Sequence, residues 1–450
     1  IRNRLLVLTY NSIMQVDENT LACKPIVTFP RNAIKRMYKD NKGCLLVTTI
    51  GSGLWAVDEG QSSPNPSIKG WKVTVLYPQV TNDFDPAQAH VNAFLEDRGG
   101  NRWIGCFRRG VLFVNDKPTS FHYLGLDQME HDNSYLLRSV FADSQHGVYV
   151  CQEKGGIKDV DLNGHVKNLW MNGYTVTTLY EMSANTFLVG TYRDGLFRLD
   201  RQTGKAEQLP IAKNQRISSI TRDRQGNIYS AVFSEGLRSY TPDGKTERVL
   251  GEGHLDLQNP YLNVLFSDAS GLIWIGHYYG IDVYNPQTDR LVDVHIPAAL
   301  RPAIVYAIVQ SPKDQSIWIG TNKGLFVYRG ARESDVWERY TQKDALPNDI
   351  VCGLVATADG SLWISTYRGL AQREPNGTFI RYYRGNGLQD WSFVRSAYTY
   401  TTDGDVIFGN HEGITYFTPD KLVKNEFLRG ITLTGMLLGN TDVNVSTRSN

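Results

Sequence analysis

The sequence predicts an all-β protein, a β-propeller array of about ten four-stranded blades. Three observations predict it. An apolar or aromatic pair followed by a small residue recurs along the chain, a glycine and an apolar residue follow it after four or five positions, and turns rich in Asp and Gly precede it. Most copies lie about 40–45 residues apart, which is the length of a propeller blade.

The clearest copies of the motif centre on Trp274, Trp318 and Trp363, each followed by Ile and then by Gly or Ser. An aromatic residue repeated in this way is expected to pack between blades, and Trp103 occupies the same position. The small-residue position recurs ten times in register, at Leu8, Thr48, Gly105, Cys151, Gly190, Ala231, Gly276, Gly320, Ser365 and Gly409.

Each repeat translates into four strands in order. In one copy an apolar stretch at 264–266 leads to an Asp-Gly turn at 268–271, because Asp closes such turns and Gly supplies positive φ. The second strand carries the Trp, and a third strand such as 325–328 follows a short Gly turn. A fourth strand, such as 379–383, completes the blade. A leucine-rich solenoid would repeat at about 20–29 residues, and helical repeats need a 3.6-residue period that is absent.

Composition narrows the function. The 450 residues carry a net charge of +1, so the basic excess of a nucleic-acid-binding protein is missing. The five cysteines form no Cys-x-x-Cys pair, and no Cys/His spacing indicates a metal. No glycine-rich phosphate loop opens a helix, so we expect no cofactor. The chain begins almost directly in a strand, without Met, and is expected to be a piece of a longer protein.

At the repeats, the pattern Asp-x-x-Gly, Leu-Trp-Ile-Gly-Thr and Gly-Leu resembles the two-component regulator propeller repeat family. The segment 344–351, Asp-Ala-Leu-Pro-Asn-Asp-Ile-Val, is similar to that family's connector between blades. Residues 409–421 resemble the exit from the propeller, and residues 431–438 resemble the first strand of the Ig-like, Tyr-rich domain that follows. The resemblance covers about residues 4 to 440.

The resemblance implies a domain order and a cellular role. Counting seven blades back from residue 420 gives three blades of an N-terminal propeller (1–130), a seven-bladed propeller (131–420) and the beginning of an Ig-like domain (421–450). A single ten-bladed ring is the alternative. The implied protein is the periplasmic sensor region of an inner-membrane hybrid two-component system, with a histidine kinase and a response regulator elsewhere in the parent chain. It would signal as a homodimer and reach the membrane only through a segment outside this sequence.

The turn between the second and third strands of each blade is the predicted binding surface, because it opens toward the central channel. Tyr rings stack on sugars, and Arg pairs with carboxylate or sulfate. The cations in these turns outnumber the acids, which favours an acidic oligosaccharide as ligand. The predicted ligand-binding residues are Tyr192, Arg193, His277, Tyr278, Tyr279, Tyr367, Arg368 and His411.

Two other function classes stay open. One is a carbohydrate-active propeller enzyme, a glycosidase or lyase. A glycosidase would need two carboxylates placed across a bond, and the turns offer Asp194, Glu235 and Glu412. A protein-interaction propeller would not need a sugar site at all. No catalytic residue and no metal ligand are predicted, so we expect this region not to be an enzyme.

Overall fold

The chain folds almost entirely into strands. The computed structural model describes residues 5–29, 34–59, 71–76, 86–97, 100–114, 121–129, 136–241, 247–250, 254–331, 334–383, 386–388, 392–422, 436–438 and 441–443. Helix in this part is limited to single 3-10 turns, which are η1 (Pro86–Gln88), η2 (Leu126–Gln128), η3 (Gln342–Asp344) and η5 (Pro419–Lys421). The predicted all-β fold of about ten blades is confirmed.

Two compact units divide the chain, one of residues 1–118 and 423–450 and the other of residues 119–422. The first unit holds three antiparallel sheets from the N-terminal part of the chain. Their strands are β1 (Leu5–Leu8), β2 (Ser12–Val16) and β3 (Cys23–Thr28), then β4 (Ile34–Lys39), β5 (Leu45–Thr49), β6 (Leu54–Glu59) and β7 (Trp71–Leu76), then β8 (Val91–Glu96), β9 (Arg102–Cys106) and β10 (Gly110–Val114).

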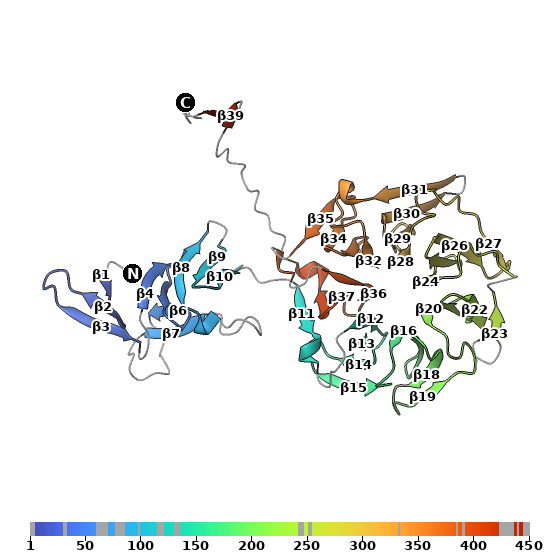
Figure 1. Cartoon of the computed structure of the whole chain (residues 1–450), viewed down its shortest axis with the longest axis horizontal. Coiled ribbons are helices and arrows are strands. Elements are labelled where there is room, and N and C mark those ends of the chain that lie inside the picture. The colour runs from blue at the N-terminus through green and yellow to red at the C-terminus, as the bar shows by residue number, and fades with distance from the viewer. Residues whose placement is uncertain are drawn as a thin grey trace. The chain divides into compact units, whose positions relative to one another are not determined.

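The second unit holds seven four-stranded sheets arranged in a ring (Figure 1). Six of them are built from consecutive strands. These are β12 (Leu137–Ala142), β13 (Val148–Gln152), β14 (Gly156–Val160) and β15 (Val166–Trp170); β16 (Val176–Ser183), β17 (Thr186–Thr191), β18 (Leu196–Asp200) and β19 (Ala206–Gln208); β20 (Ile217–Arg222), β21 (Ile228–Val232), β22 (Gly236–Tyr240) and β23 (Glu247–Val249); β24 (Leu262–Ser267), β25 (Ile273–His277), β26 (Gly280–Asn285) and β27 (Arg290–Leu291); β28 (Val305–Gln310), β29 (Ile317–Thr321), β30 (Gly324–Ala331) and β31 (Ser334–Tyr340); β32 (Val351–Ala356), β33 (Leu362–Thr366), β34 (Gly369–Arg373) and β35 (Phe379–Tyr382).

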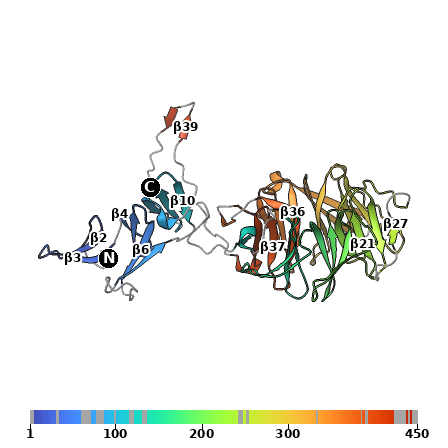
Figure 2. The same ribbon diagram turned by 60° about the horizontal axis from the view of Figure 1, so that its bottom comes forward.

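The seventh sheet closes the ring by joining the two ends of the unit. Its first three strands are β36 (Phe393–Tyr400), β37 (Val406–Asn410) and β38 (Gly413–Phe417), and its fourth is β11 (His122–Gly125), from the start of the unit. β11 pairs with β38 in antiparallel register, and the inner strands β12 and β36 also lie against each other. The turned view shows the ring obliquely, with β36 and β37 at one side and β21 and β27 at the other (Figure 2).

The predicted boundary between residues 130 and 131 lies outside the described residues and stays a prediction. β11, however, already belongs to the seven-sheet unit, so that unit extends further toward the N-terminus than the repeat count placed it. The motif count finds only complete repeats, and the closing strand precedes the first of them. From the predicted Ig-like region, the described residues are β39 (Met436–Leu438) and β40 (Thr441–Val443), which pair with each other.

The packing between blades explains the repeated motif. Trp274, Trp318 and Trp363 are buried, as expected. A Cβ atom on Gly276 or Gly320 would stand 2.6 Å from a valine Cγ1 at the start of the next inner strand. The small residue is therefore required because the neighbouring blade packs directly on it.

Trp103 does not follow the predicted pattern, since 42% of its surface is exposed. It lies in β9 with Leu95 and Phe113 exposed on the same sheet, and its ring packs on that of Phe113 at a centroid distance of 4.6 Å. Within its own unit, no described residue buries this face. Among the described residues, no helix has the length and apolar character that crossing a membrane requires.

The aspartate turns hold the aromatic residue of the following strand. The Asp143 carboxylate accepts two backbone N–H groups of its own turn and the Tyr149 hydroxyl, the last at 2.8 Å. It also pairs with Arg201 at 2.7 Å, and its side chain is fully buried. Asp268 accepts the indole N–H of Trp274 at 2.8 Å in the same way. The aspartate and the aromatic residue six positions later are thus one structural unit.

We expect Asp143→Asn to lower the free energy of unfolding at pH 7 by about 1–3 kcal/mol, because a buried charged acceptor is lost. Burial alone would raise the pKa of Asp143, but hydrogen bonds from Tyr149 and the turn, together with the Arg201 charge, hold it below 3.8. A depressed folded-state pKa stabilises the fold above the unfolded-state pKa, and this stabilisation is lost as pH falls through the folded-state value. Urea unfolding at several pH values below 5 should therefore show a smaller acid-induced loss in the variant. Equal losses would contradict this role.

Candidate ligand-binding site

The inner strands of the ring are the first strands of its blades, namely β12, β16, β20, β24, β28, β32 and β36. They share a local irregularity that leaves one residue unpaired with the neighbouring strand. In each of them the pairing register shifts between the first residue and a later one, so the second residue is left out of the ladder as a β-bulge. We call these second residues the inner ring. They are Arg138, Thr177, Ser218, Asn263, Tyr306, Cys352 and Val394. All except Cys352 line one cavity.

A second set of equivalent positions lies directly after the second strand of each blade. We call these residues the outer ring. They are Glu153, Tyr192, Phe233, Tyr278, Asn322, Tyr367 and His411. Tyr192, Tyr278, Tyr367 and His411 line the same cavity as the inner ring. Side chains from blades far apart in the sequence therefore converge at one end of the central channel.

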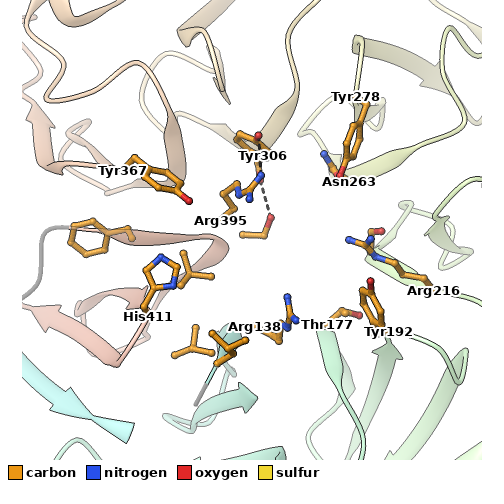
Figure 3. A pocket seen from close by; sticks show the side chains of 16 residues that line it. Arg138, Thr177, Tyr192, Arg216, Asn263, Tyr278, Tyr306, Tyr367, Arg395 and His411 are labelled. Atoms are coloured by element: carbon orange, nitrogen blue, oxygen red, sulfur yellow. Dashed lines mark hydrogen bonds between the residues drawn. The ribbon is translucent and has the colours of Figure 1, made fainter. Parts of the chain in front are cut away.

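The cavity has a volume of about 290 Å³, and side chains from several blades stand around it (Figure 3). The sixteen lining residues, all in the described part of the chain, include three arginines and no Asp or Glu. The arginines are Arg138, Arg216 and Arg395. Their side chains come from three different blades, and four tyrosines stand between them. The cavity combines an excess of positive charge with aromatic faces.

Arg395 reaches the middle of the channel because β36 departs from the other inner strands (Figure 3). From Phe393 to Tyr398, β36 advances five residues while its partner β37 advances two. In the equivalent stretch from Val351 to Leu354, β32 advances three residues while its partner β33 advances two. Within this excursion Ser396 has a φ of 62°, which is uncommon for a residue other than glycine. Residues with such backbone angles cluster at functional sites.

Two hydrogen bonds fix the excursion against β28. The Arg395 Nη1 group donates to the Tyr306 hydroxyl at 3.1 Å, and the Ser396 hydroxyl donates to the Tyr306 carbonyl oxygen at 3.2 Å. Burial alone would lower the pKa of Arg395, but its contact with Tyr306 raises it, so the guanidinium stays charged. Burial also raises the pKa of Tyr306, so its hydroxyl keeps its proton and can donate to a ligand.

Arg216 is held by aromatic rings. Its guanidinium lies 4.1 Å from the Phe233 ring centroid and 5.0 Å from that of Tyr192. Its Nε is buried and has no hydrogen-bond partner among the described residues. Stacking of this kind orients a guanidinium without neutralising it. Arg216 is therefore a positioned cation beside the cavity.

The predicted site residues divide into three groups. Tyr192, Tyr278, Tyr367 and His411 lie in the cavity wall. Arg193, Tyr279 and Arg368 are exposed in the same turns but do not line the cavity, and their part in binding stays a prediction.

His277 requires a correction, because the structure places it inside its blade. Its side chain is fully buried, its Nδ1 accepts the Tyr279 N–H at 3.1 Å, and its Nε2 lies 3.3 Å from the Asp282 carboxylate. A ligand in the channel has no access to this ring. His277 is the last residue of β25 rather than the first residue of the turn, so its side chain belongs to the blade.

The sequence-based prediction missed Arg138, Arg216, Arg395 and Tyr306, which lie at the inner strands rather than in the turns. A signal for the inner ring exists in the pattern apolar, variable, small, apolar, as in residues 217–220, Ile-Ser-Ser-Ile. The variable position is the one that faces the channel. No group of three His, Cys, Asp or Glu side chains suited to a metal ion occurs among the described residues.

Comparison with known proteins supports the fold. No protein-family model matches the chain. Histidine kinase P4 from Formosa agariphila is 20% identical over 287 residues, which are 61% of this chain and 20% of the relative. The chain thus spans about a fifth of the length of that curated relative.

Solved structures include the extracellular domain of the putative hybrid two component system BT3049 from B. thetaiotaomicron, with a TM-score of 0.70 at 19% identity over 99% of this chain and 66% of that one. The extracellular domain of BT4673 from the same organism gives a TM-score of 0.56 at 16% identity, over 99% of this chain and 61% of that one. A streptogramin B lyase covers 66% of this chain and 96% of its own, with a TM-score of 0.53 and 17% identity. At these identities the likeness shows the propeller fold.

Proposed function

We propose that this chain is the ligand-sensing region of a hybrid two-component system, a receptor with a histidine kinase and a response regulator, and that it detects an acidic oligosaccharide released from a polysaccharide. Two of the structural neighbours are extracellular domains of putative hybrid two component systems, and the curated relative is a histidine kinase. The observation that carries the ligand class is the channel cavity with three arginines, four tyrosines and no carboxylate in its wall.

The cavity wall suits an anionic sugar in its chemistry. Tyrosine rings offer apolar faces for pyranose rings and hydroxyl groups for the sugar hydroxyls. Arg395 and Arg216 offer planar N–H donors that match a carboxylate or sulfate. A volume of about 290 Å³ suits one or two sugar units, with further units directed to solvent.

An enzyme on the same fold is the alternative, since the streptogramin B lyase shares the ring of blades. A glycosidase needs two carboxylates on either side of the scissile bond, and the described cavity wall offers none. The arrangement therefore favours binding over glycoside hydrolysis.

For the parent protein we propose a periplasmic position of this region, anchorage in the inner membrane and signalling as a homodimer. Fractionation of cells that express the parent chain should place it in the inner-membrane fraction, with this region accessible to protease from the periplasm. Recovery from the cytosol would contradict the proposal.

We expect binding of acidic but not of matched neutral saccharides. A thermal-shift and calorimetric panel should contain digalacturonate, a sulfated chondroitin disaccharide and neutral disaccharides of the same size. At least one acidic saccharide should bind, with an affinity that falls as the salt concentration is raised. Chromatography of the same samples reports products. Turnover of the bound saccharide would favour the enzyme, and binding of neutral sugars alone would contradict an anion site.

A further inference from the structure

The strongest unassigned feature near the cavity is an acid that faces one of its arginines. Of the residues in the two rings, all described, Glu153 is the one carboxylate. It occupies the outer-ring position that Tyr192, Tyr278, Tyr367 and His411 hold in other blades. At this position four other blades present cavity-lining side chains, whereas this blade presents a negative charge.

Glu153 is paired with the cavity arginine of its own blade. The Glu153 Oε2 atom accepts a hydrogen bond from Nη2 of Arg138 in a close ion pair. Both side chains are only partly exposed, at 35% and 38%. The backbone N–H of Glu153 donates to the carbonyl oxygen of Leu136 at 2.9 Å, which ties the turn to the beginning of the strand that carries Arg138.

The other two cavity arginines are held differently. Arg395 donates to the neutral hydroxyl of Tyr306, and Arg216 stacks on two aromatic rings. No carboxylate pairs with either of them among the ion pairs of the described residues. Arg138 is therefore the one cavity arginine whose charge is compensated by the protein itself.

We propose that Glu153 is an internal competitor for the anionic group of the ligand and sets the charge selectivity of the channel. This inference rests on the proposed function, because it names how that same site discriminates between ligands. A ligand anion that engages Arg138 exchanges with the Glu153 carboxylate, so Arg138 adds little net affinity in the wild type. In the wild type the affinity is carried by Arg395 and Arg216, and removal of the Glu153 carboxylate frees Arg138 as a further partner for the anion.

The test measures binding of inorganic sulfate and of digalacturonate by calorimetry at low salt. The proteins are the wild type, Glu153→Gln, Arg138→Gln and the double variant, with Glu207→Gln in the exposed outer strand β19 as a control of equal charge change. Removing a partly exposed competing charge should tighten binding of each anion about 3- to 10-fold. The affinity of the control should stay within about 1.5-fold of wild type. Adding Arg138→Gln to Glu153→Gln should abolish the gain in affinity.

The outcomes separate this inference from the proposed function. The role of Glu153 as a competitor would be overturned if Glu153→Gln left saccharide binding unchanged, or if the Glu207→Gln control gained as much affinity. The sensor proposal would stand in either case. A sulfate gain without binding of any saccharide would support the competition and count against the saccharide ligand. If no variant binds sulfate, the internal competitor is refuted as well.

Discussion

Replacing Arg395 with alanine is expected to weaken binding of the acidic saccharide by about 10- to 150-fold. The reason is that Arg395 stands in the middle of the channel, remains charged and has a neutral hydroxyl as its protein partner, so a ligand anion gains the full charge-assisted hydrogen bond. Such a bond contributes about 1.5–3 kcal/mol, which corresponds to that loss of affinity. Calorimetric titration of the variant with the best binder of the saccharide panel measures it.

Two sets of control variants accompany this prediction. Arg381→Ala removes an equal charge from the outer strand β35, where the side chain is exposed, and should change affinity less than about twofold. Arg193→Ala and Arg368→Ala test the turn residues predicted from sequence. If those two variants lose as much affinity as Arg395→Ala, the ligand contacts the turns outside the cavity, and the assignment of Arg395 is wrong.

Gly413→Ala is expected to lower the free energy of unfolding by about 3 kcal/mol, the upper end of the usual cost of overpacking, and the apparent melting temperature by about 5–10 °C. A Cβ atom at this position would stand 2.3 Å from the carbonyl oxygen of Leu124 and 2.9 Å from the Cα of Gly125. These are backbone atoms of β11, so the clash is relieved only by separating the strand that closes the ring. Thermal and urea unfolding measure the effect.

The matched variant for this prediction is Gly404→Ala, in the turn between β36 and β37 of the same blade. The nearest atom to a Cβ added at Gly404 would be the Tyr400 hydroxyl oxygen, at 3.8 Å. The φ of 88° at Gly404 nevertheless makes alanine strained there. We expect a loss of about 1 kcal/mol, from the backbone alone. Equal effects of the two substitutions would show that β11 does not contribute more than an ordinary turn.

The repeat motif was sufficient to predict the blades, because each of its residues has a packing role that recurs. The tryptophans fill the space between sheets, and the glycines admit the next inner strand, as Gly276 and Gly320 show. β11 was not foreseen, since four residues carry no repeat motif and their partner strand lies almost 300 residues later. Ring closure is a long-range property that local patterns do not encode.

The site could be predicted in part for a similar reason. Tyr192, Tyr278, Tyr367 and His411 follow their second strands directly, so a turn-based prediction finds them. His277 failed because one position decides whether a side chain belongs to the strand or to the turn. Arg138 and Arg395 escaped notice because a bulge interrupts the two-residue alternation of a strand, and the excursion that carries Arg395 has no counterpart in the other blades. Arg216 lies directly before β20, outside the turns on which the prediction was based.

If the channel binds an acidic saccharide through its arginines, a crystal structure of the complex with the best binder will show the contact itself. We expect the anionic group within about 3.2 Å of the Arg395 guanidinium, with a sugar ring against one of the cavity tyrosines. A ligand bound outside the cavity, or one whose charged group faces away from Arg395 and Arg216, would contradict it.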